Sequence, residues 1–216
     1  MTFISVLLLA IALSIIQIGT IYNKGMTLRE VNQAGRTMSD DVRRNFMSSK
    51  AVSLTSDYIT HSAGGRLCLG DYTYIWNFED AITKRDTNVT TLTSSDVPVR
   101  FVKVPDPGKG YCVRSEGVFV NRTILEADES RMTELLKQGD RTLSIHQFSV
   151  NPSAEAVDTV TQQQLYELSF VIGTGDVNAL TEDRRYCAAP GTDGADFNYC
   201  AVQQFTIVIK AGSAVN

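Results

Sequence analysis

The sequence TFISVLLLAIALSIIQIGTIY occupies residues 2–22, and NKGMTLREVNQAGRTMSDDVRRNF follows it at residues 23–46. The first segment contains no charged residue, and the chain contains no proline before Pro98. Because nothing in these residues forces a break, the two segments together predict one helix. About 45 helical residues at ~1.5 Å each give a rod about 70 Å long, which exceeds an ordinary globular helix.

The apolar half of this helix, residues 1–23, matches the roughly 20 residues that a helix needs to cross a bilayer. Large apolar side chains in it favour membrane insertion by roughly 0.3–0.6 kcal/mol each. These residues are Phe3, Ile4, Val6, Leu7, Leu8, Leu9, Ile11, Leu13, Ile15, Ile16, Ile18 and Ile21. A cleaved signal peptide fits less well, because neither a basic n-region nor a small-residue cleavage site precedes Lys24. We therefore expect a single pass through the cytoplasmic membrane.

The second half, residues 24–50, is charged and amphipathic. Its apolar residues recur at steps of three and four, which places them on one helix face; they are Leu28, Val31, Ala34, Met38, Val42 and Phe46. A plain membrane anchor is usually followed by a flexible linker, whereas an apolar face must be covered. We expect these six side chains to pack on the β-rich remainder of the chain, residues 51–216.

These features resemble the type IV pilin-like proteins, and most closely the minor pilins and the J-type pseudopilins of type II secretion. The long first helix of that family also has an apolar half and an amphipathic half. The amphipathic half often contains a Gly-Arg step, then an acidic residue and one or two arginines. Here the pattern is Gly35-Arg36, followed by Asp40-Asp41-Val42-Arg43-Arg44. The resemblance covers about the first 50 residues.

The resemblance implies a structural subunit of a type IV pilus or of a related secretion or competence filament. Such a subunit waits in the lipid bilayer, is handled by inner-membrane assembly machinery, and packs against other pilin subunits through its apolar helix. It ends in an extracellular filament at the cell surface. Whether the subunit is major or minor stays open, as do adhesion, motility, DNA uptake and secretion as its role.

The N-terminus departs from the family pattern. Pilins carry a short basic leader that ends in Gly, and a Glu at the fifth mature position; Ser5 stands where that Glu would fall. We expect the given sequence to start at an internal methionine, with the leader and the glutamate encoded upstream. The alternative is a pilin that lacks the glutamate.

The charge of the chain excludes one class of partner. The net charge is −4, and residues 24–50, with six Lys/Arg and three Asp/Glu, contribute +3, so the rest of the chain is −7. Phosphate binding needs a basic surface. We therefore expect no nucleic acid to bind the acidic body.

Four cysteines form an even set without the C-x-x-C spacing of zinc or redox sites; they are Cys68, Cys112, Cys187 and Cys200. Disulfides persist outside the cytoplasm. Although Lys24 and Arg29 after the apolar run favour the cytoplasm under the positive-inside rule, we expect the body outside. Of three possible connectivities we favour Cys187–Cys200 with Cys68–Cys112, and four free buried thiols remain an alternative.

The rest of the chain predicts an α+β fold, with the long helix packed on an antiparallel sheet. One later helix is expected at residues 126–140. Aromatic, β-branched or alternating segments between turn residues predict strands. They lie at residues 66–69, 72–78, 99–104, 111–114, 117–120, 141–150, 163–172 and 201–210.

The sequence gives little indication of catalysis. It contains two histidines, His61 and His146, and no H-E-x-x-H, G-x-S-x-G or P-loop motif. Asp193, Asp196 and Asn198 offer oxygen ligands of the kind that calcium prefers, but their spacing lacks the EF-hand pattern and favours a solvated turn. We expect a non-enzymatic protein without cofactor or metal. The main rival to the pilin interpretation is a membrane-tethered extracellular binding module or adhesin that never polymerises.

Overall fold

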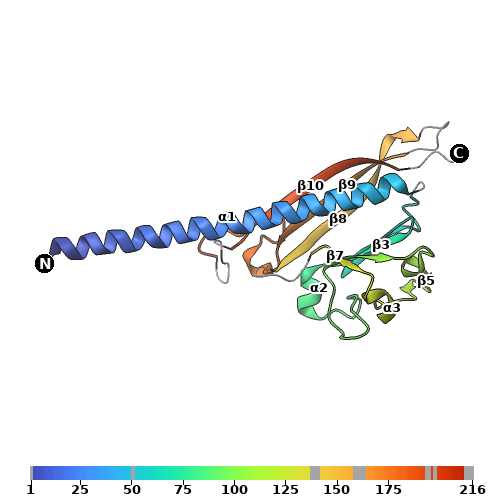
Figure 1. Ribbon diagram of the computed structural model, residues 1–216, viewed down its shortest axis with the longest axis horizontal. Coiled ribbons are helices and arrows are strands. Elements are labelled where there is room, and N and C mark those ends of the chain that lie inside the picture. The colour runs from blue at the N-terminus through green and yellow to red at the C-terminus, as the bar shows by residue number, and fades with distance from the viewer. Residues whose placement is uncertain are drawn as a thin grey trace.

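A single helix runs the length of the molecule and the body lies along half of it (Figure 1). The computed structural model describes residues 2–49, 52–136, 142–157, 164–192, 196 and 199–211. Helix α1 spans Thr2–Ser48, 47 residues without interruption. The elements that follow it form antiparallel sheets, so the predicted α+β class is confirmed.

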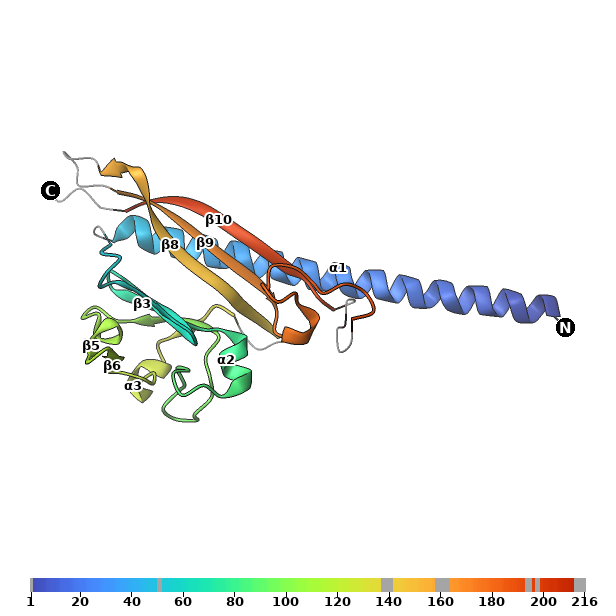
Figure 2. The same cartoon turned by 180° about the vertical axis from the view of Figure 1, so that it is seen from behind.

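Five strands in the order β1-β2-β3-β4-β7 form the larger sheet. The strand bounds are β1 Tyr58–His61, β2 Gly64–Leu69, β3 Tyr72–Asn77, β4 Phe101–Pro105 and β7 Thr133–Glu134. Short helices lie in the connections around this sheet: α2 Glu79–Lys84, η1 Gly110–Cys112 and α3 Glu126–Glu129. A separate two-stranded ribbon consists of β5 Arg114–Ser115 and β6 Val118–Phe119. The helices α2 and α3 and strand β5 lie on the side of the body away from α1 (Figures 1 and 2).

A second sheet of three long strands carries α1. Its order is β10-β9-β8, with β8 at Leu143–Val157, β9 at Gln164–Thr174 and β10 at Val202–Ala211. The 3-10 turn η2, Val177–Ala179, follows β9. The C-terminal half of α1 runs along this sheet, and its N-terminal half projects beyond the body (Figure 2).

A row of aromatic rings joins the two sheets. Phe205, Phe170 and Phe148 are cross-strand neighbours on β10, β9 and β8. The ring centroids are 5.3 Å apart between Phe205 and Phe170, and 6.1 Å apart between Phe170 and Phe148. Phe148 then contacts Trp76 of β3 at 4.3 Å. Because such pairs prefer offset or tilted contacts at these separations, the row fixes how one sheet sits on the other.

Two of the predicted elements are wrong in kind. One helix was expected at residues 126–140, and within their described part, residues 126–136, only the four residues of α3 are α-helical and β7 follows them. The amides of Leu135 and Leu136 donate to the carbonyl of Phe101, so pairing with β4 overrides local helix propensity. Residues 111–114 were expected as a strand, but η1 covers the first part of them and β5 begins only at Arg114.

Candidate functional site

The body does not bury the apolar side chains in the first half of α1. Its large apolar side chains, from Phe3 to Ile21, are each between 49% and 77% exposed. Within the described residues, α1 is the one helix long and apolar enough to cross a membrane. Ser14 and Thr20 donate to the carbonyls of Ala10 and Ile16, at 2.9 and 3.1 Å. These two hydroxyls are therefore satisfied inside the helix, as lipid requires.

The second half of α1 buries a narrow stripe of residues. Its buried positions are spaced by four, four, three, four and four: Thr27, Val31, Gly35, Met38, Val42 and Phe46. This is nearly the heptad spacing of a helix seam. The stripe differs from the predicted one at two positions, since Leu28 is 38% exposed and Ala34 is half-buried. Thr27 occupies the place expected for Leu28, and its hydroxyl donates to the carbonyl of Asn23 at 3.0 Å.

α1 approaches the three-stranded sheet closely at Gly35. A Cβ atom at Gly35 would lie 2.0 Å from the ring of Phe205, inside van der Waals contact. Only the missing side chain lets the ring sit against the helix backbone. The Gly-Arg step of the sequence thus has a physical role, because Gly35 receives the first ring of the aromatic row.

Asp41 ties α1 to the five-stranded sheet. Its carboxylate accepts a hydrogen bond from the Tyr74 hydroxyl at 2.6 Å and pairs with Lys103 Nζ at 2.7 Å. The Tyr74 hydroxyl also receives a hydrogen bond from Asn45, one turn further along α1. Burial, together with the bond to Asp41, raises the pKa of Tyr74. The helix is therefore held by both sheets, at Gly35 by one and at Asp41 by the other.

All four cysteines form disulfides. Cys68 of β2 is bonded to Cys112 of η1, and Cys187 is bonded to Cys200. The second bridge closes a loop next to the middle of α1, where Asn23 Nδ2 donates to the Tyr199 hydroxyl at 3.1 Å. Of the residues considered for calcium, Asp193 and Asn198 lie outside the described residues. In the described part of the chain, no group of three or more His, Cys, Asp or Glu residues is placed to hold a metal ion.

The two histidines have different surroundings. His146 is 5% exposed and its Nε2 lies 3.1 Å from the carbonyl oxygen of Thr174. Burial lowers the pKa of His146 to about 4. His61 instead lines a pocket, and burial followed by repulsion from Arg66 lowers its pKa.

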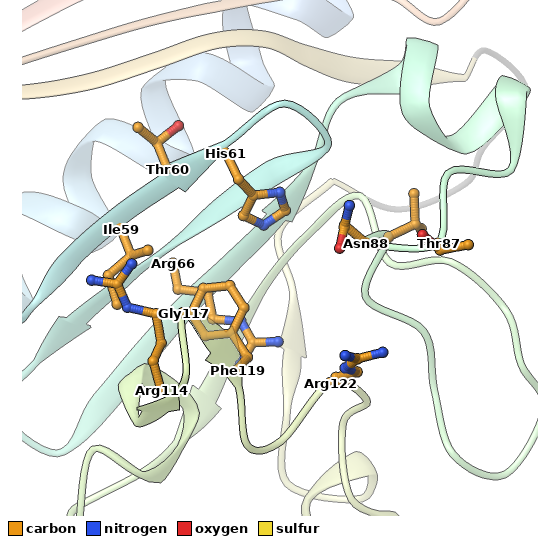
Figure 3. Close-up of a pocket in the computed structure, with 11 residues that line it drawn as sticks. Ile59, Thr60, His61, Arg66, Thr87, Asn88, Arg114, Gly117, Phe119 and Arg122 are labelled. Carbon is orange, nitrogen blue, oxygen red and sulfur yellow. The ribbon is translucent and has the colours of Figure 1, made fainter.

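That pocket has a volume of about 170 Å³ (Figure 3). Three arginines, one histidine and one aromatic ring give it its chemistry: Arg66, Arg114, Arg122, His61 and Phe119. Arg66 lies on β2, Arg114 on β5 and Arg122 in the loop after β6. His61 ends β1, and Phe119 lies on β6. Segments so far apart in the chain leave no spacing signal, so sequence reasoning missed the pocket.

Comparison with protein-family models, with curated proteins and with solved structures found no match to this chain. Its function is therefore inferred from its own residues and contacts.

Proposed function

We propose that the protein is a non-enzymatic, pilin-like structural subunit that assembles into a filament through the apolar half of α1. One observation carries the proposal: the exposed apolar half and the half packed on the body belong to one uninterrupted helix. A tether that only holds a domain near a membrane does not require its rod to continue into the domain core.

The apolar half suits both the membrane-inserted subunit and the subunit in a filament. In the cytoplasmic membrane its exposed side chains contact lipid, with the acidic body outside. In a filament, the same helices of neighbouring subunits take the place of the lipid. Ser5, Ser14 and Gly19 are small enough to let helix backbones approach closely.

The test uses a cysteine placed in the apolar half. All four native cysteines are bonded, so Ser14→Cys adds the one free thiol of the chain. Cells that make this variant are treated with a membrane-permeant bismaleimide, and filaments sheared from the surface are separated from membranes. We expect a crosslinked dimer of this subunit in the sheared fraction, since one thiol per chain allows one crosslink and neighbouring helices pack within reach of the reagent.

The matched control is Arg185→Cys, which places the thiol on an exposed position of the body. It should label with a maleimide dye but form few crosslinked dimers. If the Ser14→Cys protein stays entirely in the membrane fraction as a monomer, the tethered binding module is the better description.

A further inference from the structure

We propose that the pocket between β1, β2 and the β5–β6 ribbon binds the oxyanion of a small acidic ligand, such as the carboxylate of an acidic sugar or the phosphate of a sugar phosphate. This site is separate from α1 and does not depend on filament assembly. It rests on one buried cation, on two exposed cations at its rim and on the size of the hollow.

The buried cation is Arg66, whose side chain is 1% exposed. Its guanidinium donates to the carbonyl of Tyr111 at 2.6 Å and to the hydroxyl of Thr90 at 3.4 Å, and it lies 3.8 Å from the centroid of the Phe119 ring. Among the described residues, Arg66 forms no ion pair and its buried Nε has no hydrogen-bond partner. Because a buried charge is costly unless it is paired, the site lacks a counter-charge that an anion would supply.

One carboxylate acts on Arg66 from a greater distance. Asp106 favours the charged form of Arg66, yet burial dominates and lowers the pKa of Arg66 to about 10. The Asp106 oxygens already accept hydrogen bonds from the Thr73 hydroxyl and from the amides of Gly110 and Tyr111. Asp106 is thus committed to holding the turn of η1, and Arg66 stays charged at neutral pH.

Arg114 and Arg122 line the same pocket from its exposed rim (Figure 3). Within the described part of the chain, neither forms an ion pair. Arginine presents a planar fork of donors that matches carboxylate and phosphate geometry. Three guanidinium groups of this kind around one hollow make a positive site on a body that is otherwise acidic.

His61 adds a neutral donor. Its Nδ1 accepts the amide hydrogen of Ala63 at 3.2 Å, which leaves the proton of the neutral ring on Nε2. The ring stands edge-on to Phe119, with centroids 5.7 Å apart. Asn88, also in the lining, carries a side-chain amide whose Nδ2 donates one hydrogen to Asp86 Oδ1 at 3.1 Å and has a second hydrogen to donate. These uncharged donors suit the hydroxyl groups of a sugar next to the oxyanion.

Size and charge limit the ligand to a small one. A hollow of about 170 Å³ holds a carboxylate or phosphate with part of its carrier. The chain outside residues 24–50 carries a net charge of −7, and that field repels a polyanion at low ionic strength. A ligand with one anionic group meets the arginines without facing the whole acidic surface.

The test measures binding of three matched sugars to the full chain in micelles of a non-ionic detergent. Glucuronate, glucose 6-phosphate and neutral glucose are titrated by isothermal titration calorimetry, with inorganic phosphate as a further arm. We expect at least one of the two acidic sugars to bind saturably at one site and glucose not to bind. Comparing glucuronate with glucose 6-phosphate distinguishes a carboxylate ligand from a phosphate ligand. Comparing glucose 6-phosphate with inorganic phosphate distinguishes a phosphate ester from the free anion.

Two rim variants test the assignment without disturbing the core. Arg114→Gln and Arg122→Gln should each weaken binding about tenfold, because each removes a charge-assisted contact. Arg185→Gln makes the same charge change at an exposed position that does not line the pocket and should leave binding within about twofold. Equal loss in all three variants, or no acidic probe bound by the native chain, would overturn the proposal.

The buried residue needs a check on folding. Arg66→Gln should abolish binding, and its melting temperature in the same micelles shows whether the body still folds. Should that variant unfold, Arg66→Lys keeps the charge but loses the fork, and it is expected to bind at least tenfold more weakly. Full binding by a folded Arg66→Lys or Arg66→Gln chain would remove Arg66 from the site.

Discussion

The two halves of α1 are covalently one helix, yet they differ in how their apolar residues are arranged. Residues 3–21 carry apolar side chains all round the axis, and every large one is exposed. Residues 27–46 carry them along one seam, and the body covers that seam. The periodicity of apolar residues, more than their number, decides what a helix packs against. A full apolar surface requires lipid or several neighbouring helices, whereas a seam needs one sheet.

The largest expected effect comes from truncating the chain after the first half of α1 and after the whole of α1. A chain that starts at Thr27 should fold as a monomer, while one that starts at Ala51 should not. The second loses Val31, Met38, Val42 and Phe46, all fully buried. Each such side chain contributes roughly 1.5–3 kcal/mol, and four losses approach the ~5–15 kcal/mol stability of a typical domain. Equal melting temperatures by circular dichroism would show that the seam is dispensable.

A single substitution in each half sharpens the contrast. Phe46→Ala should lower the free energy of unfolding by about 3–5 kcal/mol, since Phe46 is fully buried and lies 5.5 Å from the ring of Tyr166. Phe3→Ala, at a site that is 77% exposed, should change it little. Urea unfolding in micelles, followed by the fluorescence of buried Trp76, measures both. Similar losses for the two variants would contradict the division of the helix.

The glycines of α1 offer a matched pair. Gly35→Ala should destabilise the body by about 1–3 kcal/mol, because the new methyl group overlaps the ring of Phe205. Gly25→Ala meets nothing within 4 Å and should be neutral or stabilising by up to about 1 kcal/mol. The same urea unfolding reports both values. If Gly35→Ala were as harmless as Gly25→Ala, close approach of the helix to β10 would not be required.

The smallest expected effect concerns the contact of Asp41 with Tyr74 and Lys103. Asp41→Asn keeps an acceptor for Tyr74 but loses the ion pair with Lys103, so it should cost about 1 kcal/mol. Asp40→Asn changes the neighbouring exposed carboxylate and serves as the control. A Lys103→Met background should abolish the difference between the two variants in a double-mutant cycle. A difference that persists there would mean that the pair with Lys103 is not its source.

Much of α1 could be predicted because its partners follow from local spacing. Steps of three and four predicted Val31, Met38, Val42 and Phe46 in the seam, and each is buried. Spacing alone did not predict that Thr27 is buried in place of Leu28, since the two are adjacent on the helix. Which of them is buried depends on how the helix packs on the sheet.

Features that depend on distant residues were not predictable in this way. The need for glycine at position 35 comes from Phe205, which lies on the last strand. β7 forms in a helix-prone segment because β4 offers its edge. The arginine pocket joins β1, β2 and the β5–β6 ribbon, which no motif spacing connects. Local periodicity predicts elements, whereas sites assembled from several elements require the tertiary structure.

The contact between the backbone at Gly35 and the ring of Phe205 has a mechanical consequence. The ring of Phe205 rests against the helix backbone there, and the next buried positions along the helix on either side are the larger residues Val31 and Met38. A pull along the rod loads the contact in shear, and α1 cannot slide unless one of these side chains climbs past the ring. The buried contacts must then give way together rather than one after another. The contact between Gly35 and Phe205 therefore resists a pull along the helix axis better than a force that lifts the helix off the sheet.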